Sequence, residues 1–395
     1  MDPRLNPFNP GAGTQPPELS GRDAVLMDAE VAISRVMAGR SAQGQILVGL
    51  RGVGKTVLLN RIWKNAQDLN ANALLIEANE KRSLASLLLP ELRRVLISLD
   101  LIASASDRVK RGMRVFRSFA AGLRLKHGAF EFELANVEPE RGIADSGDLE
   151  SDLGQLFVAV AEAVQERKTA IVLCIDELQN LTEGEFGALI MAVHKTTQRS
   201  LPLLLVSAGL PQIVALAGKS KSYAERLFLY PGIGPLREED ARSALEKPAR
   251  QEGASFSDAA LRLIVDQTKG YPYFLQEWGK EAWNTAAGPT IEEHDVRNAN
   301  PVILRNLDQN FFRVRFNRLT PSEQHYLRAL AALGPGPQRS GDIARKLGVS
   351  TNKVGPRRDG LVKKGMIYSP AHGELAFTVP LFDEFMKRVM PDDVS

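Results

Sequence analysis

The chain has 395 residues, of which 44% are hydrophobic and 25% are charged, and its net charge is +3. This composition is typical of a globular protein of two or three domains, and no apolar run approaches the ~18 residues that a membrane span needs. The N-terminus lacks a signal peptide's apolar segment and Cys174 is the single cysteine, so we expect a cytoplasmic protein with no internal disulfide, no cysteine-built zinc site and no membrane partner.

The first 20 residues are rich in proline and poor in apolar side chains. We expect them to form a tail or linker that becomes ordered only on contact. Gly21 and Arg22 follow, and the spacing of apolar residues from Leu26 to Met37 predicts a helix.

A glycine-rich motif then follows a short buried strand. Residues 49–56 spell G-x-x-x-x-G-K-T, and a helix continues from Val57, which is the strand–loop–helix order of a P-loop. Glycines let backbone N–H groups turn toward an anion, Lys55 can reach the β and γ phosphates, and the Thr56 hydroxyl can ligate Mg²⁺. A glycine-rich turn that matches by chance is the alternative. The residues expected to bind a nucleoside triphosphate here are Gly49, Leu50, Arg51, Gly52, Val53, Gly54, Lys55, Thr56 and Val57.

The next segment predicts a buried strand over 73–78 and a long helix over 84–99, lightly broken by Pro90. Residues 103–127 form a basic helical stretch, which is either a nucleic-acid contact or, as we favour, a solvated helix face. The alternating pattern of 130–134 predicts a half-exposed strand.

An apolar run over 170–175 fits a central parallel strand, and it ends in two acids, Asp176 and Glu177. Open α/β sheets place ligands at this end of their strands. We therefore expect Asp176 to hold Mg²⁺ through water and Glu177 to be the base that polarises the attacking water. The alternative is a pair of acids that caps the next helix.

A further buried strand covers 201–206 and leads to Ser207, which would lie between the P-loop strand and the acidic strand. Ser207 could contact the γ-phosphate or the water, or it could cap a helix. Arg226 could point into the nucleotide of a neighbouring subunit, although a solvated surface arginine is the commoner outcome.

Residues 236–300 shift to helices, and Tyr271-Pro272 starts one of them with proline in its first turn. Asn300-Pro301 marks a boundary, after which we expect a connecting helix over 302–313.

Residues 317–390 predict the order helix, helix, turn, helix and hairpin, which is that of a winged helix-turn-helix. Residues 339–364 contain eight basic residues and only two acids, a composition that suits a surface that neutralises phosphates. Gly355-Pro356 is expected to interrupt the recognition helix. The basic residues are Arg339, Arg345, Lys346, Lys353, Arg357, Arg358, Lys363 and Lys364. The DNA contacts we expect are Lys353, Arg357 and Arg358. Winged helices also dock proteins or form dimers, so that alternative stays open.

With these pieces in order, the chain resembles bacterial AAA+ ATPases of the origin-recognition and replication-initiator group and the related STAND ATPases. The resemblance implies a Walker A loop at 49–56, a Walker B pair at Asp176-Glu177 and an adenine-side entry motif at Gly21-Arg22. It also implies that Ser207 is sensor 1 and Arg226 the arginine finger. The second-sensor arginine of the initiators is absent, and Gly270-Tyr271-Pro272 is similar to the GxP motif of the STAND group.

The predicted fold is α/β. It has a tail at 1–20, a P-loop AAA+ core with a parallel sheet at 21–235, an all-α lid at 236–300, and a connecting helix with a winged helix-turn-helix at 301–395. ATP and Mg²⁺ are the expected cofactors, and the GxP-like motif implies slow hydrolysis that serves as a switch, with Pro272 reporting nucleotide state to the lid. We expect double-stranded DNA as the partner. The alternative is a signalling or scaffold ATPase whose winged helix binds a protein or another copy, and a helicase-like motor is a weaker third option.

Overall fold

The computed structural model describes residues 1–395 except residue 12 and residues 102–105, 123–137 and 392–395. The chain forms two compact units. We call them the sheet unit, which comprises Asp23–Val48 and Lys55–Gly232, and the helical unit, which comprises Met1–Arg22, Gly49–Gly54 and Ile233–Ser395. The chain therefore passes from one unit to the other inside the glycine-rich motif, between residues 54 and 55.

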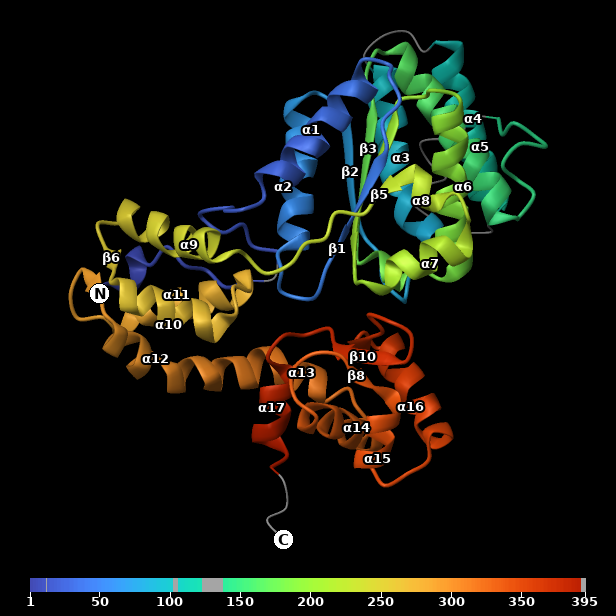
Figure 1. The fold of residues 1–395 in the computed structure, drawn as a ribbon. Helices are drawn as coiled ribbons and strands as arrows, with labels where there is room; N and C mark the ends of the chain where they lie inside the picture. Colours follow the sequence, from blue (N-terminus) through green and yellow to red (C-terminus); the bar gives the residue numbers. More distant parts are fainter. Residues whose placement is uncertain (12, 102–105, 123–137, 392–395) are drawn as a thin grey trace. The chain divides into compact units, whose positions relative to one another are not determined.

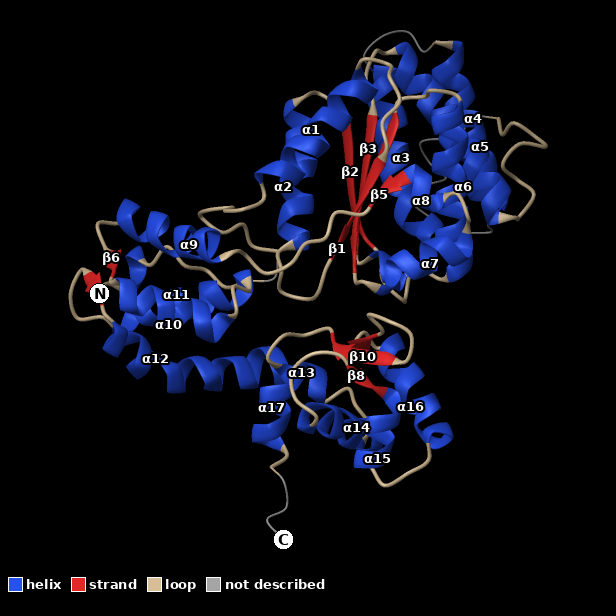
Figure 2. Ribbon diagram, viewed as in Figure 1, coloured by secondary structure: helices blue, strands red, loops and turns tan. Residues whose placement is uncertain are grey.

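The sheet unit is built on a five-stranded parallel sheet with the order β2-β3-β4-β1-β5 (Figure 2). The strands are β1 (Gly44–Val48), β2 (Asn72–Glu77), β3 (Ile171–Asp176), β4 (Leu203–Gly209) and β5 (Phe228–Leu229). Every residue of β3 is buried, as a central parallel strand requires. The predicted parallel sheet is confirmed, and β4 lies between β3 and β1.

Helices cover both faces of this sheet (Figure 1). They are α1 (Asp23–Met37), α2 (Lys55–Asp68), α3 (Leu84–Leu101), α4 (Asp107–Gly122), α5 (Leu149–Glu166), the 3₁₀ turn η2 (Leu178–Asn180), α6 (Glu183–Gln198), α7 (Gln212–Ser220) and α8 (Ala224–Leu227). Helices α1 and α2 lie on one face, and α5 and α6 lie on the other. The expected break at Pro90 is wrong, because α3 continues through this residue. Proline has no N–H to donate to the Ser86 carbonyl, and this carbonyl instead accepts a hydrogen bond from the Arg82 side chain at 2.9 Å.

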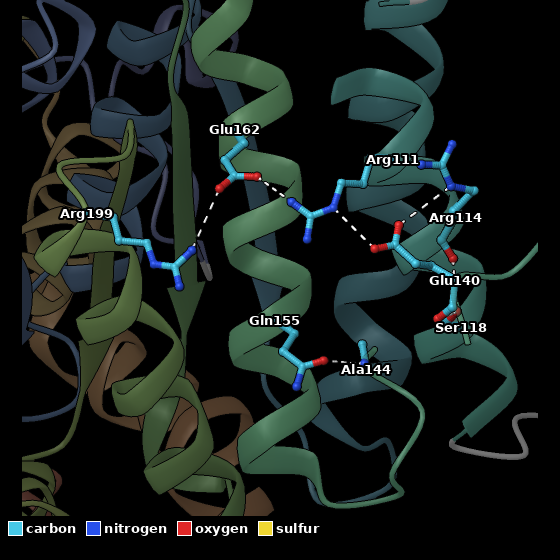
Figure 3. Close-up of polar contacts among 8 residues, drawn as sticks. All are labelled: Arg111, Arg114, Ser118, Glu140, Ala144, Gln155, Glu162 and Arg199. Carbon is cyan, nitrogen blue, oxygen red and sulfur yellow. Dashed lines mark hydrogen bonds and ion pairs between the residues drawn. The ribbon is translucent and has the colours of Figure 1, made fainter. Parts of the chain in front are cut away.

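The described part of the basic stretch is α4, and two of its arginines, Arg111 and Arg114, are paired with acids (Figure 3). Arg111 contacts Glu140 at 3.3 Å and Glu162 at 3.0 Å, and Arg114 contacts Glu140 at 3.6 Å. Glu162 also meets Arg199 at 3.8 Å. These pairs favour a charge-balanced helix face over a nucleic-acid contact. The strand expected at 130–134 lies outside the described residues.

The helical unit combines the N-terminal segment with all elements after residue 232. Its elements are η1 (Pro3–Leu5), α9 (Glu238–Gln251), β6 (Ser255–Phe256), α10 (Asp258–Thr268), α11 (Pro272–Thr285), β7 (Thr290–Ile291), α12 (Glu293–Asn306), the π-helical turn η3 (Leu307–Phe312), α13 (Arg313–Phe316), α14 (Pro321–Ala332), β8 (Gln338–Arg339), α15 (Ser340–Lys346), α16 (Thr351–Lys363), β9 (Ile367–Tyr368), β10 (Glu374–Phe377) and α17 (Phe382–Val389). Strands β6 and β7 pair in parallel, so the expectation of an entirely helical segment over 236–300 is wrong in this detail.

The N-terminal segment is ordered by contact with α11. Phe8 is buried in the core of the helical unit, and a Cβ at Gly279 would lie 2.8 Å from its ring. The Trp283 indole N–H donates to the Asp2 carbonyl at 3.0 Å. This is the contact-dependent order that the proline-rich sequence predicts.

Two helices run through prolines that we expected to end or interrupt them. Helix α12 continues through Pro301, whose place on the exposed side lets water reach the carbonyl that loses its N–H partner. Helix α16 continues through Pro356, because the preceding Gly355 has no Cβ to clash with the proline ring. The expected breaks at 300–301 and 355–356 are therefore wrong for the helices.

The C-terminal elements are α14, β8, α15, α16, β9 and β10, and their strands form a three-stranded antiparallel sheet with the order β8-β10-β9. Thr320 is the N-cap residue of α14, and it forms a reciprocal capping box with Glu323. The predicted hairpin over β9 and β10 is confirmed. Strand β8 was not predicted, because a two-residue strand leaves no alternating pattern.

Candidate nucleotide-binding site

The acidic end of β3 meets the start of α2 within the sheet unit. The Thr56 hydroxyl donates to one oxygen of Asp176 at 2.6 Å, and the Glu177 N–H donates to the other at 2.8 Å. Asp176 is 8% exposed. Burial raises its pKa, and the two hydrogen bonds and the nearby Lys55 charge act in the opposite direction.

The two residues expected to hold Mg²⁺, Thr56 directly and Asp176 through water, thus lie in contact although they are far apart in the sequence. A hydroxyl and a carboxylate are oxygen ligands of the kind that Mg²⁺ takes, and two of them leave room for water and phosphate oxygens. The donor set therefore fits the ion. Lys55 is buried at the first position of α2, beside these oxygens.

Glu177 has a left-handed backbone, with φ 51°, directly after the strand. The Gln179 amide N–H donates to the Glu177 carboxylate, and the Gln179 carbonyl oxygen accepts from the Leu210 N–H at 3.0 Å. Gln179 therefore ties the Glu177 side chain to the end of β4. Sequence reasoning missed this residue, because its second partner is brought near only by the strand order.

Ser207 lies inside β4, opposite Ile175 of β3 and Ile46 of β1. The helix-cap alternative is wrong for this residue. Its side chain is fully buried, and its hydroxyl has no hydrogen-bond partner within the described parts of the chain. Buried hydroxyls normally have a partner, so this one is available to a ligand or a water.

Arg226 lies on the short helix α8 and its side chain is exposed. Its backbone carbonyl accepts from the Gln43 side chain at 2.7 Å. An exposed position is compatible with both the surface-residue and the arginine-finger interpretations, so the finger role stays a prediction.

The glycine-rich segment Gly49–Gly54 belongs to the helical unit. Gly52 and Gly54 have φ values of 80° and 89°, which favour glycine. A Cβ at Gly49 would overlap the carbonyl oxygen of Ile233. Val53 is buried, Leu50 and Arg51 are half-buried, and Val57 is half-buried on α2 in the sheet unit.

Arg22, in the N-terminal segment, forms hydrogen bonds to the backbone of this glycine-rich segment. Its guanidinium donates to the carbonyls of Val53, at 3.3 Å, and of Gly234. Burial lowers the pKa of Arg22. Gly21 has φ 69°, and a Cβ there would collide with the Asp240 carboxylate. The entry motif thus contacts the loop backbone directly.

Helix α11 approaches the same segment from another side. Tyr271 is its N-cap residue and Pro272 its first residue, and both are half-buried. The Tyr273 N–H donates to the Gly52 carbonyl at 3.2 Å. Gly270 accepts from the Leu236 N–H at 2.8 Å and could not carry a Cβ against the Leu236 carbonyl. We had not predicted the contact of Tyr273.

The C-terminal segment also reaches the loop. The Arg51 N–H donates to the Thr378 carbonyl at 3.0 Å, and the Thr378 hydroxyl donates to the Gly365 carbonyl. No local signal could have predicted this pair, because the two residues are distant in the sequence.

The three expected DNA contacts lie on α16. Lys353 is exposed and Arg357 is one helical turn further on, half-buried. Arg358 pairs with Asp359 at 2.9 Å. Lys364 pairs with Glu323 at 2.7 Å, an acid that lies outside the stretch in which we counted charges.

Two parts of the chain match known families of protein domains. Residues 18–206 match the AAA ATPase domain family, and residues 309–386 match a domain of unknown function (DUF8462). No curated protein matches the chain.

Several solved structures are similar to this one. The Walker-type ATPase paby2304 of Pyrococcus abyssi has 16% identity and a TM-score of 0.58, with 97% of this chain and 99% of that chain covered. The RuvB Holliday junction branch migration motor of Thermotoga maritima has 16% identity and a TM-score of 0.44, with 94% and 95% covered. The Aeropyrum pernix Orc1 protein in complex with DNA has 16% identity and a TM-score of 0.46, with 94% of each chain covered.

At these identities the likeness concerns the fold, and the Pyrococcus structure supports it over nearly the whole chain. The family match covers the P-loop and the acidic strand. Residues 18–206 therefore carry a P-loop ATPase domain of the AAA+ kind, and the AAA+ part of the resemblance stated from the sequence is confirmed for these residues.

Proposed function

We propose that the chain binds ATP with Mg²⁺ on its P-loop and hydrolyses it slowly, as a nucleotide switch. The observation that carries this proposal is the 2.6 Å contact between Thr56 and Asp176, which joins the hydroxyl of the loop motif to the carboxylate of the acidic strand. The match of residues 18–206 to the AAA ATPase domain supports nucleotide hydrolysis in general.

Each residue then has a role of its own. The loop N–H groups and Lys55 bind the phosphates, and Thr56 and Asp176 hold Mg²⁺, which neutralises phosphate charge when it is bound. Glu177 accepts a proton from the attacking water, and Gln179 keeps its carboxylate aimed. The unpartnered Ser207 hydroxyl contacts the γ-phosphate or that water. Arg226 would complete the site of a neighbouring copy.

Slow hydrolysis and switching rest on the contacts of α11. The Tyr273–Gly52 hydrogen bond links the start of this helix, where Pro272 stands, to the loop. We propose that residues 236–300 act as the lid and that Pro272 reports nucleotide state to it, with residues 21–235 as the ATPase core and residues 1–20 as the tail.

We further propose that residues 301–395 contain a winged helix that binds duplex DNA. The order of α14, β8, α15, α16, β9 and β10 and the β8-β10-β9 sheet support this fold. Lys353 and Arg357 lie on one face of α16, where they can contact phosphates. The alternative is a docking module for a protein or a second copy, and the ion pairs of Arg358 and Lys364 favour it, because they leave fewer cations for DNA.

Nucleotide binding is tested by calorimetry on Lys55→Ala. The buried ammonium is the charge expected to bind the phosphates, so ATP affinity should fall by at least tenfold while the circular dichroism spectrum stays unchanged. Lys64→Ala, an exposed lysine of α2, is the control and should bind as the parent does. Retained ATP affinity in Lys55→Ala would show that the glycine-rich motif is not the ATP-binding site.

DNA binding is tested by fluorescence anisotropy on labelled duplex with ATP, ADP or no nucleotide. Affinity that differs between nucleotide states supports a switch on DNA. Absence of binding at low salt in every state would favour the docking alternative.

A further inference from the structure

Helices α12 and α13 are joined by the π-helical turn η3 without a break in the helical backbone (Figure 1). The Arg313 N–H donates to the Asp308 carbonyl, which lies five residues earlier, whereas an α-helix pairs residues that are four apart. The turn therefore contains one residue more than an α-helical turn needs. Single π-turns inside α-helices are rare and are frequently found at functional sites.

Side chains on the α11 side hold this turn. Phe311 stacks on Tyr273 with ring centres 4.5 Å apart, and the Arg315 guanidinium lies 4.3 Å from the centre of the Phe311 ring. The same guanidinium donates to the Phe311 carbonyl. Because Phe311 is buried, the place of its ring determines how the backbone of η3 is turned.

A second set of contacts joins the turn to α17. The Asp308 carboxylate pairs with Arg388 at 2.6 Å, and Phe312 stacks on Phe385 with ring centres 5.2 Å apart. Both Arg388 and Phe385 belong to α17. A change in the form of η3 therefore alters how the end of the chain is attached to α12.

Tyr273 also contacts the glycine-rich loop through its backbone. Its N–H donates to the Gly52 carbonyl at 3.2 Å. A trans peptide is planar and its N–H and C=O point in opposite directions, so the direction of this carbonyl sets the direction of the Val53 N–H. Under the proposed function, the Val53 N–H is one of the loop groups that bind phosphate. A bound phosphate fixes this peptide, and with it the acceptor of the Tyr273 N–H.

We propose that η3 switches between a π-turn and an α-helical turn, and that nucleotide bound on the loop favours the π-turn. This inference rests on the proposed nucleotide binding. With nucleotide bound, the Gly52–Val53 peptide is fixed and Tyr273 keeps Phe311 stacked. Without nucleotide the peptide is free to turn, Tyr273 loses its hydrogen bond, and η3 relaxes to the commoner α-helical pairing.

The two forms orient the following elements differently. Each residue of an α-helix turns the chain by about 100° and advances it by about 1.5 Å. Loss of the extra residue from the turn therefore rotates α13, and the elements after it, by about 100° around the axis of α12. Two discrete turns with different orientations are the kind of two-state element that links distant sites. This switch gives nucleotide state a physical route to α16.

The first test is hydrogen exchange of residues 307–316, followed by mass spectrometry with and without ATP and Mg²⁺. ATP should slow exchange there by at least about tenfold, because it holds the turn in one form. Calorimetry on the same sample shows whether ATP is bound. A parent that binds no ATP contradicts the proposed function itself, whereas bound ATP with unchanged exchange overturns the switch alone.

Phe311→Leu separates this route from a general stabilisation. The variant keeps an apolar side chain but loses the stack on Tyr273, so ATP should still bind and should slow exchange at 307–316 by less than about twofold. Phe316→Leu is the matched control, because this buried ring contacts Phe385 at 5.8 Å and should leave the slowing intact. Full slowing in Phe311→Leu overturns the role of the stack.

Deletion of Gln309 tests the extra residue directly. Gln309 is exposed, and its removal lets the turn take α-helical pairing while the elements on either side keep their places. The deleted chain should fold and bind ATP, but exchange at 307–316 should no longer respond. A parent-like response to ATP in this variant overturns the switch.

Spin labels report the rotation itself. Val302→Cys lies on α12 and Val314→Cys on α13, at valines that are 41% and 49% exposed, and Cys174 is buried and will not react. In the doubly labelled parent, ATP should shift the distribution of distances between the labels, whereas the Gln309 deletion should give one distribution with or without ATP. A parent distribution that bound ATP leaves unchanged overturns the proposal, even if exchange is slowed.

Discussion

At the scale of single residues, Glu177 is the side chain that the proposed hydrolysis needs and that nucleotide binding does not. Its carboxylate accepts from Gln179, and Gln179 is itself held by the Leu210 N–H. A general base acts efficiently only when it is held in reach of the proton that it accepts. The amide is therefore a positioning group for the proposed reaction.

We predict that Gln179→Ala lowers the rate of ATP hydrolysis by about tenfold or more, since a mispositioned base loses much of its contribution. ATP affinity should be unchanged, because Gln179 contacts neither the loop motif nor Asp176 through any hydrogen bond found between described residues. Phosphate release and calorimetry measure the two quantities. Gln198→Ala, at an exposed glutamine that ends α6, is the matched control. Parent-like turnover in Gln179→Ala would mean that Glu177 is held by other groups.

The burial of Asp176 predicts how stability and Mg²⁺-dependent ATP affinity depend on pH. Burial raises its pKa, so the carboxylate lowers the stability of the folded protein above that pKa, and this penalty disappears as the pH falls through it. Mg²⁺ needs the ionised form. Mg²⁺-dependent ATP affinity should therefore decline on acidification at a higher pH than an ordinary aspartate would require, as calorimetry between neutral and acidic pH can measure.

Asp176→Asn should remove this pH dependence. Its amide can still accept from the Glu177 N–H and meet the Thr56 hydroxyl without a buried charge, so without Mg²⁺ it should be more stable than the parent by about 1 kcal/mol at neutral pH. Glu80→Gln, at an exposed residue between β2 and α3, is the control. A parent-like stability and pH profile in Asp176→Asn would show that the buried charge does not control the site.

At the scale of elements, aromatic side chains connect α11 to the C-terminal helices. Tyr273 stacks on Phe311 with ring centres 4.5 Å apart, and Phe312 stacks on Phe385 at 5.2 Å. Phe311 and Phe312 both lie in the π-helical turn η3, where the chain passes from α12 to α13. These contacts fix the geometry of a turn that has poorer backbone hydrogen bonding than an α-helix.

We predict that Phe312→Ala destabilises the helical unit by about 3 kcal/mol or more, because a fully buried ring is lost and leaves a cavity. Trp278 and Trp283 are buried in this unit, so guanidinium unfolding followed by tryptophan fluorescence reports on it. Val314→Ala, at a 49% exposed valine two residues away, should stay within about 0.5 kcal/mol of the parent. An unchanged midpoint in Phe312→Ala would contradict the structural role of this cluster.

The helices, strands and loops also differ in how far the sequence predicts them. The strands beside the P-loop and Asp176 were predictable, because apolar runs and glycines are local signals. The contacts of Arg51 with Thr378 and of Gln179 with Leu210 were not, because each joins segments that only the fold brings together. Prolines misled us in three helices, since at Pro90 a side chain replaces the lost N–H and at Pro356 a preceding glycine removes the clash.

At the scale of the whole molecule, charge decides between the two proposed partners of the C-terminal elements. A net charge of +3 is too small to bind DNA without local concentration of cations. Within the described residues, three of the eight basic side chains between 339 and 364 are paired with acids, namely Arg345, Arg358 and Lys364. Five remain for phosphates, namely Arg339, Lys346, Lys353, Arg357 and Lys363.

Because bound phosphates release counterions, the number of available cations sets how steeply DNA affinity falls with salt concentration. Each neutralised phosphate contributes about −0.9 to the slope of log affinity against log salt, so five cations permit a slope no steeper than about −4.5. We predict that Lys353→Ala makes the slope shallower by about 1, while Arg345→Ala, whose guanidinium is already paired with Asp342, changes it little. Anisotropy titrations on duplex DNA across a salt series measure both. A slope near zero, or equal losses in the two variants, would contradict binding through α16, and the docking of a protein would become the better account of this surface.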